Sequence, residues 1–320
     1  TMSFRLPPLG ALLPVLFIVA NSFSQSATNS VLSQGEWYKI AVSKDGIFKI
    51  DKAFLQSMGI SAADIDPTKI GIFGNGGGML PEKAGTFPHD DLVENAIQVH
   101  GENDGSFDDG DHILFYGQNP NRWHYEQAED RFIYETNIYT TETYYFLTTT
   151  EGTGKRVQIQ NSSSLPATHF SSTYDRHEVI NDERVNLIQS GRTWFGDHFD
   201  AFIPSRTYSF NFPNRDVNKP VFIKTNVAAR SIGTDSHIEV DFNGATVLGG
   251  TITNVTGTFD RAYAHDTSPS TFINPAGDAA TLVFTYNGVG NAKAWLNYIE
   301  ANARCHLVYG GGQLFFRDKE

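Results

Sequence analysis

The sequence has 320 residues, of which 40% are hydrophobic, so it is long enough for two ordinary domains with a buried core in each. Its formal net charge of -12 at pH 7 argues against nucleic acid as a partner, because phosphates bind basic surfaces, and against a polybasic membrane anchor. The 24 Phe and 13 Tyr, with frequent Gly and no long Leu/Glu/Lys/Ala tracts, are typical of a β-rich protein.

The N-terminal segment predicts a secretory signal peptide over residues 1–25. Arg5 precedes the apolar run from Leu9 to Ala20, and the small residues Ser22 and Ser24 follow where a signal peptidase cuts. The run spans about a dozen residues, whereas a transmembrane helix needs about twenty. We therefore expect export without a permanent membrane anchor.

Residues 26–160 predict a β-rich α+β domain with one short helix. The stretch "EWYKIAVSKDGIFKID" predicts a hairpin whose two strands meet at the turn Lys44-Asp45-Gly46. Asp51 is the expected N-cap of the short helix, and Gly59 occupies its C-terminal stop position. Further strands are expected in "KIGIFGNGGGM", "AIQVHG", "DHILFYG" and "TYYFLTTT".

Residues 161–175 predict a linker, since they are rich in Ser and Thr, contain a proline and lack a hydrophobic period. Residues 176–320 then predict an antiparallel β-sandwich of the jelly-roll or immunoglobulin-like kind. Alternating segments such as "RTYSFNF", "HIEVDFNG" and "ATLVFTYNG" are separated by turn residues about every ten positions, including Asn243-Gly244 and Asn287-Gly288. The stretch "DRHEVINDERVNLIQSG" fits either a short helix or a strand.

Two short motifs superficially resemble ligand sites. Gly74 to Gly78 lacks the Lys-Ser/Thr and following helix that a phosphate loop needs, and Pro81 follows instead, so a flexible turn is favoured. "HEVIN" begins like a zinc-protease helix at His177, but Asn181 stands where the second histidine must lie. Neither motif therefore predicts a cofactor or metal site.

The single cysteine, Cys305, cannot form an internal disulfide. Its neighbour His306 would point to the opposite face of a strand, so the two residues do not form a nucleophile and base pair. A buried, inert thiol is the expectation for Cys305. The histidines His198, His237 and His265 are scattered, and no G-x-S-x-G elbow occurs. The sequence thus predicts no catalytic, cofactor-binding or metal-binding residue.

The stretch "GENDGSFDDGDHILFYG" carries Asp104, Asp108, Asp109 and Asp111 within eight residues. An EF-hand loop that began at Asp104 would need glycine at its sixth position, where Asp109 stands, and a glutamate at its twelfth, which is absent. An exposed turn is favoured. A calcium site of another kind stays open, and with it a calcium-stiffened adhesion module.

The aromatic stretch "FIYETNIYTTETYYFL", Phe132 to Leu147, is compatible with a sugar-stacking platform. Alternating aromatic residues along strands more often pack in a core and against cross-strand neighbours. An exported carbohydrate-binding module therefore remains an alternative function.

Five segments in this order and at these distances carry a family resemblance: "WYKIAVSKDGIFKID", "IGIFGNGGGMLP", "GENDGSFDDGDHILFYG", "SGRTWFGDHFD" and "LNYIEANARCHLVYGGGQLFFRD". Together they resemble the N-terminal region of the PorU sortases of the type IX secretion system in Bacteroidetes, a family of gingipain-type cysteine peptidases. The resemblance covers almost the whole mature chain. It implies N-terminal β-domains that precede a peptidase domain with a His/Cys dyad, which removes the C-terminal signal of secreted cargo.

The resemblance implies a non-catalytic region, because no residue of this chain matches the catalytic cysteine or histidine of the family. Cys305 lies in "LNYIEANARCHL", a sandwich segment, and does not take the nucleophile's role. The location that the resemblance implies is the outer-membrane cell surface or the periplasm. The expected partners are the protein's own peptidase domain, outer-membrane secretion components such as PorV, and secreted cargo. The expected function is support of the peptidase domain, cargo recognition or docking to the secretion complex, with no cofactor and no peptidase activity of its own.

Overall fold

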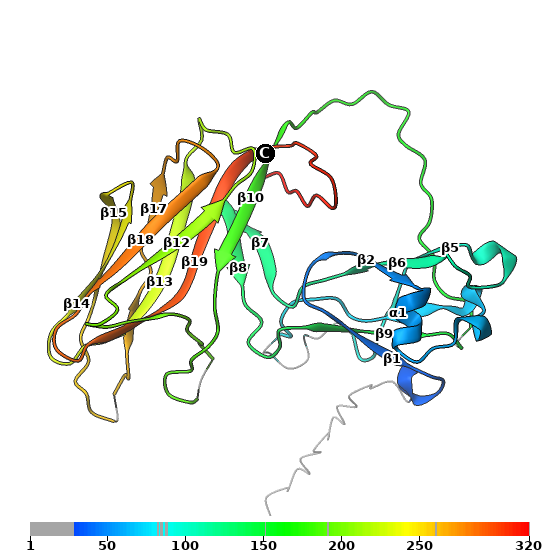
Figure 1. Cartoon of the computed structure of the whole chain (residues 1–320), viewed down its shortest axis with the longest axis horizontal. Helices are drawn as coiled ribbons and strands as arrows, with labels where there is room; N and C mark the ends of the chain where they lie inside the picture. The colour runs from blue at the N-terminus through cyan, green and yellow to red at the C-terminus, as the bar shows by residue number, and fades with distance from the viewer. Residues whose placement is uncertain are drawn as a thin grey trace, which may run out of the picture.

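The computed structural model describes residues 29–319 except 82, 84, 85, 87, 88, 151, 191 and 260. The predicted signal peptide lies outside the described residues. The described chain is mainly antiparallel β structure with one short α-helix, which confirms the predicted fold class (Figure 1). Within these residues, no helix has the length and apolar character needed to span a membrane.

The first half of the chain forms three small sheets with the strand orders β1-β9-β3-β4, β2-β6-β5 and β7-β8. One buried cluster joins the first two sheets and the helix, and includes Leu55, Ile72, Ile113 and Leu147. The elements are η1 (Val31–Ser33), β1 (Tyr38–Val42), β2 (Gly46–Asp51), α1 (Lys52–Ser57), η2 (Ala62–Asp64), η3 (Pro67–Lys69), β3 (Gly71–Phe73), β4 (Glu94–Asn95), β5 (Gln98–His100), η4 (Glu102–Asp104), β6 (His112–Gly117), β7 (Arg122–Glu126), β8 (Arg131–Glu135) and β9 (Thr143–Thr148).

The predicted hairpin at residues 36–51 is wrong in its pairing. Both strands exist, but β1 pairs with β9 and β2 pairs with β6, so the turn carries the chain from one sheet to another. The physical reason is burial: Ile40 and Val42 of β1 and Ile50 of β2 enter the same cluster from two different sheets. The same turn residues allow either a hairpin or a crossing between two sheets. Burial of both strands in one core favours the crossing.

The short helix agrees with its predicted signals. The Asp51 side chain accepts a hydrogen bond from the Phe54 backbone N at 3.1 Å, which satisfies one of the free N–H groups of the first turn. Gly59 follows the helix with φ +84°, a conformation that favours glycine. Leu55 is the fully buried residue through which the helix contacts the core.

The second half of the chain is an antiparallel sandwich, as predicted. A six-stranded sheet has the order β10-β19-β13-β16, with β11 also on β19 and β17 also on β13, and a four-stranded sheet has the order β12-β18-β14-β15. The strands are β10 (Thr173–Ile180), β11 (His198–Phe199), β12 (Ser205–Asn211), β13 (Val221–Arg230), β14 (Ser236–Phe242), β15 (Ala245–Ile252), β16 (His265–Thr267), β17 (Ser270–Ile273), β18 (Ala279–Asn287) and β19 (Lys293–His306).

The structure decides one stretch that the sequence leaves open and shows how two predicted turns are used. The start of "DRHEVINDERVNLIQSG" is strand rather than helix, since β10 runs to Ile180. Asn243 and Gly244 have φ values of +54° and +77° and join β14 to β15 as a tight hairpin. Asn287-Gly288 does not form a hairpin turn, because it lies between β18 in one sheet and β19 in the other.

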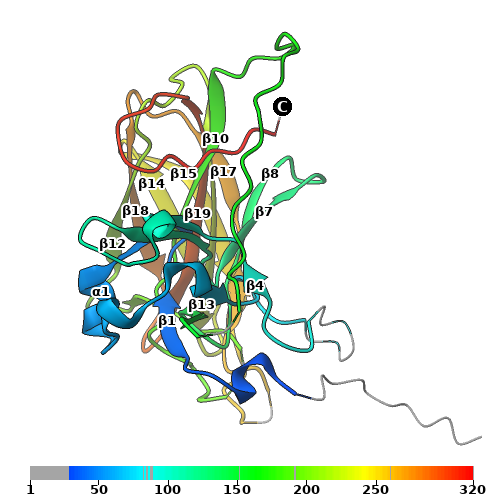
Figure 2. The same ribbon diagram turned by 90° about the vertical axis from the view of Figure 1, so that its right-hand side faces the viewer.

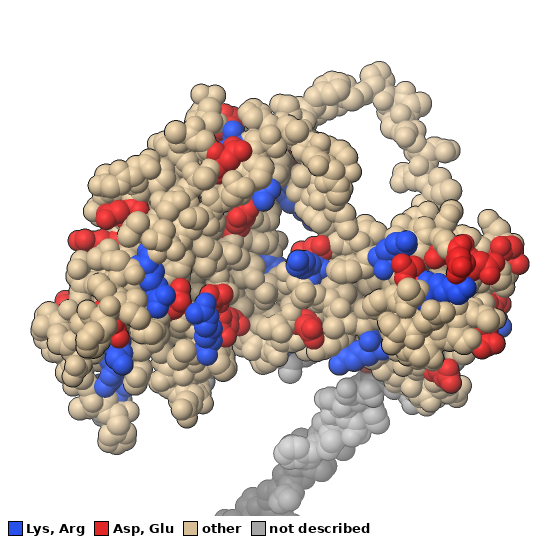
Figure 3. Space-filling view, viewed as in Figure 1, with Lys and Arg blue, Asp and Glu red and all other residues tan. Residues whose placement is uncertain are grey.

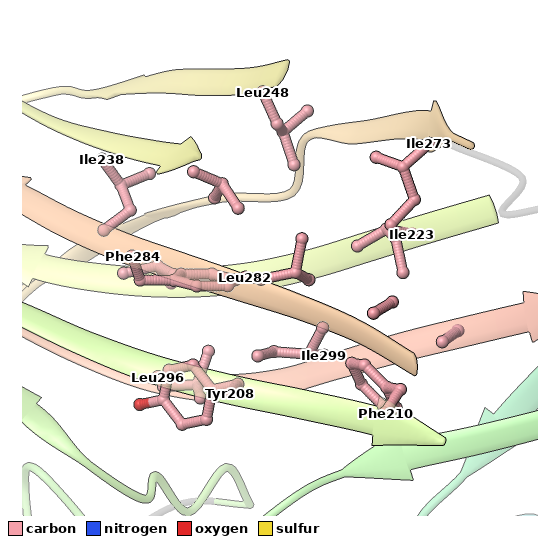
Figure 4. Packing of buried hydrophobic residues seen from close by; sticks show 14 of the residues in the cluster. Tyr208, Phe210, Ile223, Ile238, Leu248, Ile273, Leu282, Phe284, Leu296 and Ile299 are labelled. Atoms are coloured by element: carbon pink, nitrogen blue, oxygen red, sulfur yellow. The ribbon is translucent and has the colours of Figure 1, made fainter. Parts of the chain in front are cut away.

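The core of the sandwich lies between its two sheets (Figure 4). Leu282 and Phe284 of β18 and Ile223, Leu296 and Ile299 of the six-stranded sheet are buried there. Full burial of such a side chain contributes about 1.5–3 kcal/mol. The inward set alternates with an outward set along each strand, and the outward set of the six-stranded sheet forms the candidate site.

Residues 157–172 are the last part of the connection from β9 to β10 and contain no strand. The segment arches away from the body of the molecule in both ribbon views (Figure 1, Figure 2). It contains no Lys, Arg, Asp or Glu and is plain tan in the space-filling view (Figure 3). A separate buried cluster lies on each side of it. The division at residues 160 and 175 stays a prediction.

Candidate functional site

The outer face of the six-stranded sheet is where other parts of the chain contact the sandwich. Because side chains alternate along a strand, Phe222, Asn226 and Ala228 of β13 lie on this face, opposite the core. Glu300 and Asn302 of β19 share it, since Asn302 pairs with Phe222 in the sheet register. The face carries polar groups inside a sheet, so it needs partners to satisfy them.

The β7–β8 hairpin of the first half covers one end of this face. Arg131 Nη1 lies 3.1 Å from Glu300 Oε2, and both side chains are buried. The backbone N of Tyr134 donates to Glu300 Oε1 at 3.2 Å, and the backbone N of Phe132 donates to Asn302 Oδ1 at 3.0 Å. Burial raises the pKa of Glu300, while the Tyr134 N–H and Arg131 oppose that rise. The hairpin thus attaches the first half of the chain to the second through a buried ion pair.

His177 of β10 extends this contact with aromatic packing. Its ring lies 4.4 Å from that of Trp123 and 4.7 Å from that of Phe132, measured between centroids, and stacks on the second. Burial, together with Arg176 and Arg317, lowers the pKa of His177 to about 4. The imidazole is therefore neutral at pH 7, as its apolar neighbours require.

The C-terminal segment, residues 307–319, follows β19 of the second half and contacts the first half of the chain. The Gln313 side chain accepts a hydrogen bond from the Ile47 backbone N at 2.7 Å and donates to the Ile47 carbonyl at 2.8 Å. Lys319 Nζ lies 2.6 Å from Asp130 Oδ2 in the turn of the β7–β8 hairpin. A cavity of about 700 Å³ lies between this segment, the β7–β8 hairpin and β10, where the two halves of the chain meet.

The glycine stretch Gly74 to Gly78 is a turn without a following helix. Gly76 and Gly78 have φ values of +78° and +91°, which favour glycine. The Gly77 backbone N donates to Gln118 Oε1 at 2.9 Å, and a side chain at Gly77 would overlap the Asn119 carbonyl. The glycines therefore allow close packing against the start of β7, and they do not form a phosphate site.

The four aspartates of the acidic stretch are already occupied by local partners. Asp104 Oδ1 accepts from the Ser106 backbone N at 3.1 Å, and Asp111 Oδ2 accepts from the Asp108 backbone N at 2.7 Å. Asp109 pairs with Lys52 of α1 at 2.8 Å, which lowers the pKa of Asp109. The acidic side chains gather at the outer end of the first half (Figure 3). Within the described part of the chain, no three His, Cys, Asp or Glu side chains are grouped to hold a metal ion.

We expect calcium to leave the stability of the protein unchanged. A ligand that binds only the native state raises the unfolding midpoint, so midpoints in about 1 mM CaCl₂ and in excess chelator should coincide. Differential scanning calorimetry measures this. A calcium-dependent rise of the midpoint that disappears in the Asp104→Asn variant would show that the turn is a calcium site after all.

The remaining sequence candidates do not come together. Cys305 is fully buried in the sandwich core, whereas His306 beside it is exposed. His198, His237 and His265 belong to β11, β14 and β16 and are separate. The aromatic residues of 132–147 are also divided: Phe132 faces the sandwich, Tyr145 is buried in the first core, and Tyr144 lies at the surface with Lys39 Nζ 3.5 Å from its ring centroid. They form no common platform.

The thiol of Cys305 should be unreactive in the folded protein. Burial raises the pKa of Cys305 to about 11, so almost no thiolate is present at pH 8. Ellman's reagent is expected to label the cysteine completely in about 6 M urea and negligibly in buffer, apart from labelling through global unfolding. Rapid native labelling would contradict the buried position.

The fold and site define a mainly antiparallel β protein with two large hydrophobic clusters, in which the β7–β8 hairpin joins the first half of the chain to the outer face of the six-stranded sheet. No protein-family model and no curated protein sequence matches the chain. Its structure is similar to the crystal structure of dimeric latent PorU from Porphyromonas gingivalis, with a TM-score of 0.72 and 24% sequence identity. The match covers 92% of this chain and 26% of that PorU chain.

The likeness to PorU confirms the resemblance seen in the sequence and shows the fold of this chain. The chain resembles a part of PorU and spans about a quarter of its length. A second solved structure, the insecticidal delta-endotoxin Cry8Ea1 from Bacillus thuringiensis, has a TM-score of 0.27 and 12% identity over 76% of this chain and 43% of its own. That likeness is too low to support any conclusion.

Proposed function

We propose that this chain is the non-catalytic N-terminal region of an exported, gingipain-like cysteine peptidase, a sortase of the type IX secretion system. The observation that carries the proposal is the fold match to PorU over 92% of the chain. The predicted signal peptide supports export. The burial of Cys305, with His306 on the opposite side of the strand, supports a non-catalytic role.

The docked hairpin supports a scaffold role for this region. Arg131, Glu300 and His177 hold the two halves of the chain together, and the C-terminal segment, which follows β19 of the second half, contacts the first half at Ile47 and Asp130. Residues that continue the chain beyond this segment would start from the junction of the two halves. The region would support a peptidase domain there and present surfaces to cargo or to outer-membrane components such as PorV.

The DNA sequence downstream of Glu320 tests whether this chain is part of a longer peptidase. We expect an in-frame continuation that encodes a peptidase domain with a His/Cys dyad. We also expect purified residues 26–320 to cleave no fluorogenic Arg or Lys peptide. A stop codon directly after Glu320 would contradict the sortase proposal and would leave a separate β protein.

The alternative of a carbohydrate platform at residues 132–147 loses its basis, because Phe132 and Tyr145 pack in different places. The alternative of a calcium-stiffened adhesion module rests on Asp104 to Asp111, whose carboxylates are engaged locally. Neither alternative has an observation in its favour.

A further inference from the structure

A pocket of about 400 Å³ opens on the outer face of the six-stranded sheet, at the end that the β7–β8 hairpin leaves uncovered. Strands β13, β16 and β19 contribute residues to it, and residues 186–188, 190, 192, 193 and 195 contribute another side. This volume lies within the range of small-molecule sites. The pocket is separate from the contact with the β7–β8 hairpin and from the core of the sandwich.

A β-bulge places the polar groups of this pocket. The pairing of β13 with β19 shifts between Asn226 and Val227, which leaves Asn297 as the extra residue of β19. Bulges redirect side chains and are frequent near functional sites. Asn297 Nδ2 donates to Asn226 Oδ1 at 2.9 Å, so the extra residue is turned toward the outer face.

Asn226 fixes the other polar side chains of the pocket. It is 6% exposed, and its Nδ2 donates to Asp266 Oδ2 and to Ser268 Oγ, each at 2.7 Å. The network therefore exists before any ligand binds, which lowers the entropic cost of binding. Among the described residues, Asp266 Oδ1 and Asn297 Oδ1 have no hydrogen-bond donor, so two acceptors are available to ligand hydroxyl groups.

The rest of the pocket combines small and aromatic side chains. Ala228, Ala262 and Ala264 leave room for a compact ring. Tyr263 lines the same pocket, is 40% exposed, and carries the Arg230 guanidinium 4.5 Å from its ring centroid. An aromatic face beside acceptor groups suits a ligand that has C–H groups on one face and hydroxyls around its edge.

The pocket carries few charged groups. Its charged lining side chains are one cation, Arg192, and one anion, Asp266. The Arg230 guanidinium beside Tyr263 leaves one cation unbalanced, which is less positive charge than a phosphate site gathers. We propose that this pocket binds an uncharged polyhydroxylated ring such as a hexopyranose, with hydroxyls on Asp266 and Asn297 and one face on Tyr263.

The proposal is tested by titration of the full chain with methyl α-D-glucopyranoside, methyl α-D-galactopyranoside and N-acetylglucosamine. Saturation-transfer NMR and calorimetry should show a Kd of roughly 1 mM for at least one of them. Asp266→Asn, which keeps an acceptor for Asn226, and Tyr263→Ala, at an exposed side chain, should each weaken binding about tenfold or more. Inorganic phosphate should not bind.

The matched control is Asp241→Asn. Asp241 lies on β14 of the other sheet and likewise accepts one side-chain hydrogen bond, from Thr246 at 2.7 Å. This variant should bind the sugar as the unmodified protein does. The proposal is overturned if none of the three sugars binds up to about 50 mM, if Asp241→Asn weakens binding as much as Asp266→Asn, or if phosphate binds more tightly than the sugars. Unfolding midpoints show whether each variant is folded.

Discussion

Arg131→Met is expected to lower the free energy of unfolding by about 3–5 kcal/mol, because it leaves the buried Glu300 carboxylate without its cation. Methionine preserves most of the side-chain volume, so the decrease in the free energy of unfolding comes from the missing positive charge and not from a cavity. The pair is 169 positions apart in the sequence and joins the β7–β8 hairpin to β19. Urea unfolding followed by Trp fluorescence measures the change, since Trp123 lies in the same contact.

The double variant Arg131→Met/Glu300→Gln is the control. Glutamine keeps an oxygen that accepts the Tyr134 N–H bond but removes the buried charge, so about 2 kcal/mol or more should be regained. An exposed pair, Lys49 with Asp51, gives the reference: Lys49→Met should change stability by less than about 1 kcal/mol. An Arg131→Met loss as small as that reference would contradict a buried, structural ion pair.

Acidification should weaken the same contact through His177. Its pKa is lowered from 6.5 to about 4 in the folded state. Between these two values the unfolded chain binds a proton at His177 and the folded chain does not, so a falling pH favours unfolding. Stability from this group is fully present above pH 6.5 and is lost as the pH falls toward 4. The loss reaches at most about 3 kcal/mol, at 1.36 kcal/mol for each pKa unit.

The contribution of His177 is isolated with His177→Gln, which cannot titrate. Other groups also respond to acid, and the raised pKa of Glu300 acts in the opposite direction, because protonation of Glu300 is favoured in the folded state. The difference between the stability curves of the unmodified protein and the variant should be flat from pH 8 to 6.5 and then decline. Parallel curves down to pH 4.5 would show that His177 is exposed to solvent.

Most of the fold could be predicted from the sequence, because the information is local. Alternating apolar residues predict the strands of the sandwich, Asp51 predicts the start of the helix, and Asn243-Gly244 predicts a hairpin that is present. The pairing of β1 with β2 could not be decided locally. The turn at Lys44-Asp45-Gly46 allows both a hairpin and a crossing between sheets, and only the common core of Ile40 and Ile50 selects the crossing.

The candidate site was harder to predict, since its residues are distant in the sequence. Glu300 stands inside the apolar stretch "AWLNYIEANA", and a carboxylate in a buried strand requires a partner, which was an available signal. Nothing in the local pattern identifies Arg131 as that partner. The sequence around His177 begins like a zinc-protease helix, but His177 lies in a strand and packs against aromatic rings.

The most direct test of the proposed role compares the full-length protein with a form that lacks residues 26–320. Both forms keep the signal peptide and the proposed peptidase domain, and both are measured for sortase or peptidase activity and for the unfolding midpoint of the peptidase domain. We expect the truncated form to lose activity and to unfold at a lower temperature, because the domain loses the surface on which it packs. Equal activity and an equal midpoint in the two forms would contradict the scaffold role of this region.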